Sequence, residues 1–403
     1  MARTPAGFPG GVRISDYLTV NVIAQVYPHD TVRDVLRQTD SDSLRRRDLP
    51  AEVMVYYVIA MALFRAVSAR EVLRCLVDGL RLSEPGRALK VSGKSSISRA
   101  RGRLGQQPFA ALRSACVTPL AGPDTRGAWY RGLRVVAFDG STLNLPDEAR
   151  NRNTFGLPNS ARGAAAFPQL RLTTMVEAGT RAAFAWHAGP LSESEAEQAE
   201  RLLPELGVGM LVLADRNYGG YPLWLRAQAT GAELLWRFRS NHRFPVEEAY
   251  ADGSWRSVIR GSGRDRRKSR GTLPVRVIAY RLEPGDTRYT LVTTLLDPDR
   301  APAAELAALY HERWEIETAY DEVKTHLLGP GTLLRSKTPE LVYQEVDGLM
   351  LAHYAVRHLI HRAAVKAGED PDRLSFVHAV RAMRRRITHP GGFPPTGADG
   401  RAH

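Results

Sequence analysis

The sequence predicts an α/β protein in which a helical N-terminal region precedes a mixed sheet flanked by helices. Two observations predict this fold class. Up to about residue 125, apolar residues recur at helical spacing, as in segment 17–26 and in the apolar run 53–64. From about residue 130, continuous apolar runs such as LRVVAFDG and GMLVLAD replace that spacing, and such runs are typical of buried strands.

The composition is that of a basic globular protein. The chain of 403 residues carries 56 Lys and Arg against 43 Asp and Glu, a formal net charge of +13. This excess favours a polyanionic partner, either nucleic acid or an anionic membrane surface. The run 53–64 is shorter than the roughly 20 residues that span a bilayer, and the N-terminus lacks the apolar region of a signal peptide. We therefore expect a cytoplasmic, nucleoid-associated protein outside the membrane.

The cysteines and histidines show no metal-binding pattern. Cys75 and Cys116 lie far apart and outside any Cys-x-x-Cys pair, so neither a disulfide framework nor a zinc site is expected. His187, His242 and His311 do not form a ligand spacing either.

Residues 1–125 are predicted to form a helical DNA-binding domain. SAREVLRCLVDGL, in which Ser68 and Glu71 are spaced as a capping box, is followed by a Pro-Gly break and the basic segment KSSISRARGRLG. Helix, turn and basic helix are typical of a helix-turn-helix, although solvated arginines on a surface helix would give the same pattern. We predict DNA contacts from Arg99, Arg101 and Arg103.

Residues 126–390 are predicted to form a second domain, with strands and helices in the order β-ββ-α-β-α-β. LRLTTMVEAGTRAAFAWHAG indicates two strands around a turn at 178–180, and Ser192 with Glu195 fits a capping box before the next helix. A β-rich insertion is expected at about 240–300, and residues 391–403 are expected to be disordered. The insertion contains an exposed basic loop whose DNA-binding residues are predicted to be Arg264, Arg266, Arg267 and Lys268.

Segment YHERWEIETAYDEVK, at 310–324, is predicted to lie on one long helix from about 302 to 328. At about 100° per residue, one polar stripe borders the apolar face of that helix: Tyr310, Arg313, Glu317 and Lys324. The remaining glutamates are expected to face solvent: Glu312, Glu315 and Glu322. An ordinary salt bridge between Arg313 and Glu317, at i and i+4, would also account for part of the pattern.

Two aspartates close apolar runs elsewhere in the chain. VVAFDG ends with Asp139 and LVLAD ends with Asp215, and acids at strand ends lie at a sheet rim, where loops build sites. Together with Glu317 they supply the carboxylate oxygens that Mg²⁺ prefers. Two such ions can activate the attacking oxygen and stabilise the leaving oxygen in phosphoryl transfer.

The pattern Tyr-x2-Arg-x3-Glu-x6-Lys at 310–324 resembles the signature of the insertion-sequence-4 family of DDE transposases. FDGSTLNLPD and LADRNYGGYPLW are similar to the two aspartate segments of that family. LTVNVIAQVYPHDTVRDVLRQT and SSISRARGRLG are similar to its helical DNA-binding domain. The resemblance extends from about residue 15 to about residue 390.

This resemblance implies a ribonuclease-H-like core interrupted by the β-rich insertion. It implies that Asp139, Asp215 and Glu317 bind two Mg²⁺ ions, with Mn²⁺ as a substitute. It implies that DNA phosphate is held by Tyr310, Arg313 and Lys324. The implied activity is cleavage at the ends of an insertion sequence followed by strand transfer. The implied partners are double-stranded DNA at the terminal inverted repeats, target DNA, and a second copy of the chain on DNA.

Relatives that form DNA hairpins hold a flipped base on an aromatic side chain. Trp314 and Trp255 are the candidates here, although core packing would account for either.

Three other interpretations stay open. The ending TGADGRAH stands where the family continues in a basic segment, which suggests a transposition-incompetent remnant and a monomer or weak dimer in the absence of DNA. A metal-dependent nuclease without strand transfer would need only the acids. A non-catalytic DNA-binding protein would need none of them.

Overall fold

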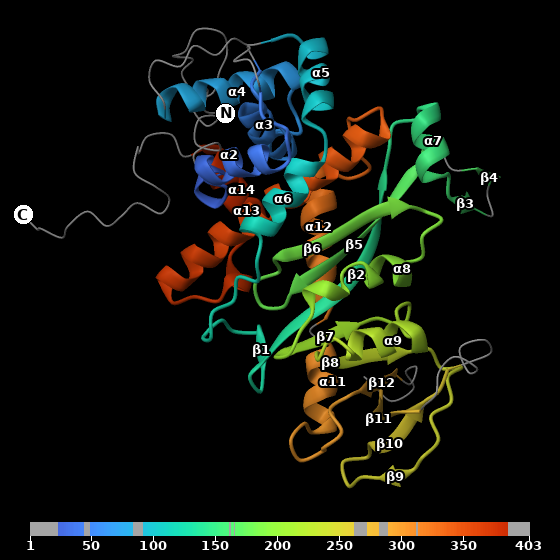
Figure 1. Cartoon of the computed structure of the whole chain (residues 1–403). Helices are drawn as coiled ribbons and strands as arrows, with labels where there is room; N and C mark the ends of the chain where they lie inside the picture. Colours follow the sequence, from blue (N-terminus) through green and yellow to red (C-terminus); the bar gives the residue numbers. More distant parts are fainter. Residues whose placement is uncertain are drawn as a thin grey trace, which may run out of the picture. The chain divides into compact units, whose positions relative to one another are not determined.

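The structure is a computed structural model that describes residues 23–43, 49–83, 92–160, 163–164, 166–261, 272–281, 289–311 and 313–385. The chain divides into two compact units (Figure 1). The helical unit comprises Met1–Thr118, Asn144–Pro168 and Asp321–His403, and the sheet unit comprises Pro119–Leu143 and Gln169–Tyr320. The domain boundary predicted near residue 125 lies close to the first of these breaks. The structure differs from the prediction in grouping the chain after Asp321 with the N-terminal helices.

The helical unit is built around two helices that pack closely. Its N-terminal helices are α2 (His29–Gln38), α3 (Ala51–Leu63), α4 (Ala69–Ser83), α5 (Lys94–Leu104) and α6 (Gln107–Cys116). Its later elements are α7 (Ala149–Phe155), β3 (Asn159–Ser160), β4 (Gly163–Ala164), η2 (Glu322–Leu328), α13 (Pro339–Ala367), η3 (Pro371–Arg373) and α14 (Phe376–Arg385). A Cβ at Gly348 of α13 would lie 2.6 Å from Val58 Cγ1 of α3, so this contact requires glycine.

The apolar run 53–64 forms α3, and all but one of that helix's residues are buried, as predicted. Ser68 Oγ accepts the backbone N–H of Glu71 at 3.2 Å, in agreement with the predicted helix start. Within the described residues, no helix is both long and apolar enough to span a bilayer.

The sheet unit contains one large mixed sheet. Its strands are β1 (Trp129–Tyr130), β2 (Leu133–Asn144), β5 (Gln169–Glu177), β6 (Ala183–Pro190), β7 (Met210–Ala214), β8 (Glu233–Phe238), β9 (Glu248–Ala249), β10 (Trp255–Ile259), β11 (Leu273–Tyr280) and β12 (Tyr289–Thr293). The order β6-β5-β2-β7-β8, with β2, β7 and β8 parallel, is that of a ribonuclease-H-like core, as predicted. The insertion is β-rich, as predicted, and its strands continue the same sheet in the order β12-β11-β10-β9.

The helices of the sheet unit are α8 (Glu195–Glu200), η1 (Leu203–Glu205), α9 (Tyr221–Gln228), α11 (Ala303–His311) and α12 (Trp314–Asp321). Figure 1 shows α8 and α9 on one face of the sheet and α11 with α12 on the other. The capping box before α8 is formed by Ser194 and Glu197, so the predicted pair Ser192 and Glu195 was wrong by two residues. The segment contains two overlapping Ser-x-x-Glu patterns, and spacing alone does not distinguish them.

The single long helix predicted at 302–328 was wrong. The backbone turns at Arg313 between α11 and α12, and α12 continues into η2, a π-helix. A π-helix has i to i+5 hydrogen bonds, so the 100° spacing assumed for this segment does not hold beyond Asp321.

The position of Glu322 shows the consequence. It was expected to face solvent, but it is 3% exposed and forms an ion pair with Arg357, and its Oε2 lies 3.0 Å from His353 Nε2. Both partners lie on α13, more than thirty residues further along the chain.

Candidate active site at the carboxyl edge of the sheet

Two aspartates lie side by side on parallel strands. The pairing of β2 with β7 matches Ala137 with Leu213, so the same register continued by two residues places Asp139 beside Asp215. Adjacent strands lie roughly 4.8 Å apart, and residues in register on parallel strands point to the same face. Asp215 directly follows β7, as predicted, whereas β2 continues past Asp139 to Asn144. We call the region where these acids lie the carboxyl edge.

Backbone amides orient both carboxylates. The N–H of Gly140 donates to Asp139 Oδ1 at 2.9 Å, and the N–H of Asn217 donates to Asp215 Oδ1 at 2.8 Å. A Cβ at position 140 would lie only 3.1 Å from the Tyr218 hydroxyl oxygen. This crowded position of β2 therefore favours glycine. The two carboxylates are therefore held by the local backbone before any ligand binds.

Two buried tyrosines fasten α11 and α12 to this edge. The Tyr320 hydroxyl donates to the carbonyl oxygen of Asp139 at 2.9 Å, and the Tyr310 hydroxyl donates to the carbonyl oxygen of Ala214 at 3.2 Å. Each anchor lies at, or one residue before, one of the two aspartates. Thr174 on β5 also bonds to the Tyr320 hydroxyl, at 3.1 Å. These bonds fix where α12 crosses the strands that carry the acids.

Glu317 lies on α12, three residues before Tyr320. Residues at i and i+3 share a helix face, so position 317 lies on the face that Tyr320 fastens to the strand of Asp139. The side chains of Glu317 and Trp314 lie outside the described part of the structure. The structure therefore describes the backbone at position 317, and the role of its carboxylate stays a prediction.

The other residues of the predicted signature are Tyr310, Arg313 and Lys324. Tyr310 was expected to hold DNA phosphate, but it is 5% exposed and its hydroxyl is bonded to the sheet. Burial raises the pKa of this hydroxyl well above its usual range, Arg313 opposes that increase, and Asp215 adds to it. The Arg313 guanidinium lies 5.7 Å from the centre of the Tyr310 ring. Lys324 is half-buried in η2, in the helical unit.

The donor set at this edge suits a hard divalent cation, because carboxylate oxygens are the ligands that Mg²⁺ and Mn²⁺ prefer. Asp139 and Asp215 supply two carboxylates on one face of neighbouring strands. Among the described side chains, no three His, Cys, Asp or Glu form a metal-binding group, and the third predicted ligand is the carboxylate of Glu317.

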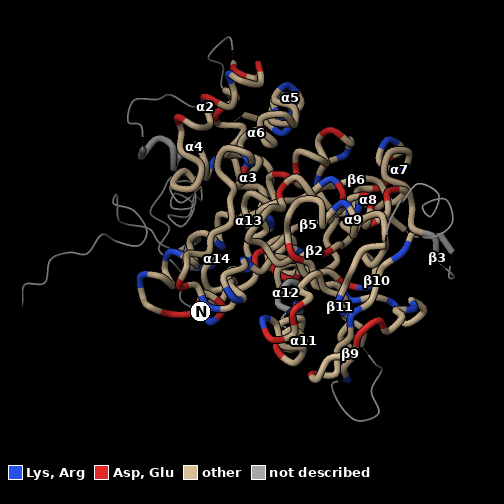
Figure 2. The backbone as a smooth tube through the Cα atoms, turned by 60° about the horizontal axis from the view of Figure 1, so that its bottom comes forward, with Lys and Arg blue, Asp and Glu red and all other residues tan. Residues whose placement is uncertain are grey.

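The basic helix α5 was predicted to contact DNA through its arginines, and only some of these arginines are exposed. Arg99 and Arg103 are exposed, one helical turn apart, and Figure 2 shows basic residues along this helix. Arg101 was predicted to contact DNA, and that was wrong. It is 6% exposed, and its guanidinium donates to Gln344 Oε1 at 2.8 Å and Ser336 Oγ at 3.0 Å.

Most of the other predicted DNA contacts lie outside the part of the chain that the structure describes. Arg264, Arg266, Arg267 and Lys268 lie outside the described residues, as does the turn between α4 and α5. Trp255 on β10 is half-buried, and its indole N–H donates to the carbonyl oxygen of Phe244 at 3.4 Å, which indicates packing rather than base binding.

Sequence reasoning missed three arginines at the carboxyl edge: Arg216, Arg237 and Arg239. Arg216 directly follows Asp215. The pairing of β7 with β8 matches Ala214 with Trp236, so the register continued by one residue places Arg237 beside Asp215. The available signal was Arg237 itself, a charge interrupting the apolar run ELLWRF.

Comparison with known proteins finds matches over most of the chain. Residues 18–113 match the family described as insertion element 4 transposase N-terminal, and residues 130–355 match the transposase DDE domain. The chain is 30% identical over 388 residues to the transposase InsG for insertion sequence element IS4 of Escherichia coli (strain K12), covering 94% of this chain and 84% of that protein. A piggyBac transposase synaptic complex with hairpin DNA aligns over 95% of this chain, with 12% identity and a TM-score of 0.49.

Proposed function

Because this chain belongs to the insertion-sequence-4 family of DDE transposases, and so is a DNA-cleaving and strand-transferring enzyme, we propose that Asp139, Asp215 and Glu317 are its catalytic acids. The observation that supports this proposal is the register of β2 and β7, which matches Asp139 with Asp215 when it is continued by two residues. The hydrogen bond from Tyr320 of α12, the helix that bears Glu317, to the carbonyl oxygen of Asp139 adds to it. Enzymes of this family use divalent metal ions, and DNA is their partner.

The acids would hold two Mg²⁺ ions, with Mn²⁺ as a substitute. Ions held there would polarise the phosphodiester and lower the pKa of the attacking hydroxyl or water. The amides of Gly140 and Asn217 already fix one oxygen of each aspartate, so the carboxylates need little reorganisation to bind a cation.

Positively charged residues admit the anionic substrate. Arg313 can grip a phosphate through two N–H groups, and Lys324, in the helical unit, can act as a point charge on DNA phosphate. Tyr310 positions α11 rather than binding DNA, since its hydroxyl fastens this helix to the end of β7.

The same three acids then serve two successive in-line displacements at phosphorus. Water attacks the phosphodiester at the end of the element and releases a 3′-hydroxyl, and that hydroxyl attacks a second phosphodiester in the acceptor strand. Each displacement breaks one P–O bond and forms one, so no covalent protein–DNA intermediate is required.

Substitution of each acid by its amide tests the assignment. Asp139→Asn, Asp215→Asn and Glu317→Gln should each reduce cleavage of a duplex carrying the terminal inverted repeat by at least about a thousandfold, roughly 4 kcal/mol of transition-state stabilisation. DNA binding should change little, because the acids do not hold the duplex.

The control is Glu315→Gln, two residues away on α12, which should cleave as the wild type does. Equal loss in Glu315→Gln and Glu317→Gln would contradict the assignment of Glu317.

We also propose that the enzyme works as a homodimer assembled on the terminal inverted repeats, because two ends must be cut and joined together. Light scattering should show a larger species only when the end duplex is added. Mixing Asp215→Asn chains with chains defective in DNA binding should restore cleavage if each active site cuts DNA held by its partner. Absence of any restored cleavage, once pairing on DNA is confirmed, would rule out cutting in trans.

A further inference from the structure

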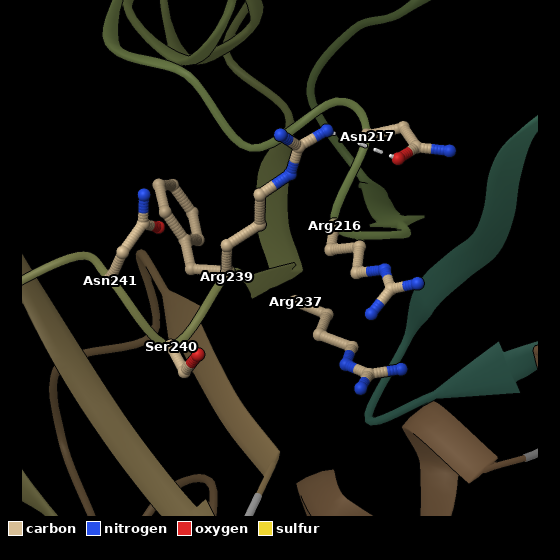
Figure 3. Close-up of a pocket in the computed structure, with 7 residues that line it drawn as sticks. Arg216, Asn217, Arg237, Arg239, Ser240 and Asn241 are labelled. Carbon is tan, nitrogen blue, oxygen red and sulfur yellow. Dashed lines mark hydrogen bonds between the residues drawn. The ribbon is translucent and has the colours of Figure 1, made fainter.

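Tyr218 packs against both strands that carry the proposed catalytic aspartates. Arg216 and Asn217 line an open pocket in the turn after β7 (Figure 3), whereas the next residue, Tyr218, is buried in the protein and only 2% exposed. Its backbone N–H donates to the carbonyl oxygen of Asp215 at 3.2 Å. Its ring stacks on Phe138, at the end of the apolar run of β2, with 5.8 Å between ring centres. The side chain is therefore held beside both aspartates by contacts that do not use its hydroxyl.

The Tyr218 hydroxyl is buried without a hydrogen-bond partner among the described residues. Burial raises the pKa of this hydroxyl well above its usual range, and neighbouring groups, among them Asp139 and Glu195, add to the increase. The hydroxyl is therefore a donor placed among acids. An unpaired buried hydroxyl destabilises a fold, and phenylalanine would fill the same space without that cost. This oxygen therefore indicates an acceptor that reaches it in another state of the site.

Glu195 approaches the same point from α8. A Cβ on Gly140 would lie 3.1 Å from the Tyr218 hydroxyl oxygen and 3.2 Å from Glu195 Cδ, so both groups lie against the residue that follows the first aspartate. The cap of α8 is formed by Glu197, which leaves the Glu195 carboxylate for other contacts. Its Oε1 pairs with Arg171 Nη1 at 3.1 Å, and within the described part of the chain Oε2 has no partner.

A change in side-chain torsions joins these two groups. The last torsion of a glutamate, about the Cγ–Cδ bond, has a broad minimum, so the carboxylate can turn at little cost. Because the Tyr218 hydroxyl and the Glu195 carboxyl carbon lie against the same backbone atom, such a turn can bring Oε2 to the roughly 2.7 Å of an O–H···O bond.

A divalent cation at the aspartates would attract this carboxylate. Mg²⁺ keeps several waters, which donate hydrogen bonds to acceptors roughly 4–5 Å from the ion. Gly140 directly follows Asp139, so Glu195 lies near the strand end that binds the ion. Figure 1 shows α8 on the sheet face opposite α12. No three acids among the described side chains are placed to hold a metal directly, which favours a contact through water.

We propose that Tyr218 is a positioning residue for the cation site and acts through Glu195. When a divalent cation is bound, the Tyr218 hydroxyl donates a hydrogen bond to Glu195 Oε2, and this oxygen accepts a second hydrogen bond from a water on the cation. Arg171 keeps the other carboxylate oxygen. This inference rests on the proposed function of Asp139 and Asp215 and assigns a role to two residues outside the predicted set.

The first readout is thermal stability without metal. Tyr218→Phe removes only an unpaired hydroxyl, so its melting temperature should equal or exceed that of the wild type. The matched control is Tyr56→Phe, because the Tyr56 hydroxyl donates to the carbonyl oxygen of Tyr27 at 2.6 Å, and this variant should melt about 2–4 °C lower. An equal loss in Tyr218→Phe would mean that its hydroxyl already serves the fold and would overturn the proposal.

The second readout is the dissociation constant for Mn²⁺, measured on the full chain by electron paramagnetic resonance. Tyr218→Phe and Glu195→Gln should each weaken Mn²⁺ binding about tenfold, the size of one hydrogen bond to a charged group. The double variant should weaken it no further than Glu195→Gln alone, because Tyr218 acts through that carboxylate. Glu200→Gln, on the same helix and paired with Arg226 at 2.6 Å, should bind Mn²⁺ as the wild type does.

Unchanged Mn²⁺ binding in both single variants would overturn the proposal, and so would fully additive losses in the double variant. Asp139→Asn and Asp215→Asn separate this inference from the proposed function. If they lose Mn²⁺ binding while Tyr218→Phe and Glu195→Gln keep it, the inference fails and the catalytic assignment stands. If they keep Mn²⁺ binding while Tyr218→Phe and Glu195→Gln lose it, the catalytic assignment fails and the coupling of Tyr218 to Glu195 stands.

Discussion

The arginines of the helical unit and those of the carboxyl edge differ in their surroundings. Arg101 and Arg357 are 6% and 1% exposed and donate to fixed acceptors on neighbouring helices. Arg216 and Arg237 face a pocket and have no carboxylate partner among the described residues. Burying a guanidinium is tolerated only when acceptors compensate for lost hydration. The comparison teaches that the partners of an arginine in the fold decide whether it stabilises the protein or is available to bind a ligand. Its presence in a basic sequence segment does not decide this.

The largest expected effect comes from Glu322, the anion that neutralises Arg357. In Glu322→Gln the buried guanidinium would lose its counter-charge, which costs about 3–5 kcal/mol in the free energy of unfolding. Urea denaturation measures this loss. The control is Glu340→Gln, which breaks an exposed ion pair with Arg150 and should cost less than about 1 kcal/mol. Similar small losses in both variants would erase the distinction between buried and exposed pairs.

Arg101 provides the next test, because an exposed arginine lies on the same helix. Arg101→Met would leave the acceptors on Gln344 and Ser336 unpaired, so a loss of about 2–3 kcal/mol is expected by urea denaturation. Arg103→Met, at an exposed position, should stay within about 0.5 kcal/mol of the wild type. A stable Arg101→Met protein with reduced DNA affinity would instead support the original DNA-contact prediction.

His353 predicts how the buried cluster responds to pH. Its burial lowers its pKa from 6.5 to about 3. Below pH 6.5 the unfolded chain therefore binds a proton that the folded chain does not. As the pH is lowered from about 6.5 to about 3, the free energy of unfolding decreases by up to about 1.4 kcal/mol per pH unit. Above pH 6.5 this contribution is constant. Comparing the pH dependence of unfolding in wild type and His353→Gln isolates it, and identical curves would contradict the prediction.

The smallest effect on stability is expected for Arg99 and Arg103, the exposed pair on α5. Replacing both with Ser should leave stability within about 0.5 kcal/mol. If both contact phosphate, the slope of log affinity against log salt should fall by about 1.8, because each contact contributes about 0.9. The control, Arg373→Ser, removes an exposed arginine paired with Glu369 and should keep the slope. An unchanged slope in the double variant would show that α5 is merely solvated.

The two proposed catalytic aspartates could be predicted from the sequence because their signal is local. Asp139 and Asp215 each follow an apolar run, and a buried strand that ends in an acid needs no distant partner to be recognised. The ribonuclease-H-like strand order followed from the family resemblance, and the structure agrees with it.

The failures share a physical cause, which is that the deciding partner is remote in sequence. Arg101 was taken for a surface residue because its acceptors lie more than 230 residues away. Glu322 was placed in solvent because a continuous α-helix was assumed, whereas the π-helix η2 turns it towards Arg357 on α13. Arg216 and Arg237 come together only through the parallel pairing of β7 and β8, which no local pattern encodes.

The most direct test of the catalytic carboxyl edge is a metal-switch experiment at the phosphate that is cut. Each non-bridging oxygen of that phosphate is replaced in turn by sulfur, and cleavage is measured with Mg²⁺ and with Mn²⁺, which tolerates sulfur better. The wild type should lose at least about tenfold in rate with one sulfur isomer in Mg²⁺ and recover it in Mn²⁺, whereas Asp215→Asn should recover nothing. Equal rates for oxygen and both sulfur isomers in Mg²⁺, or full recovery by Asp215→Asn in Mn²⁺, would contradict the account.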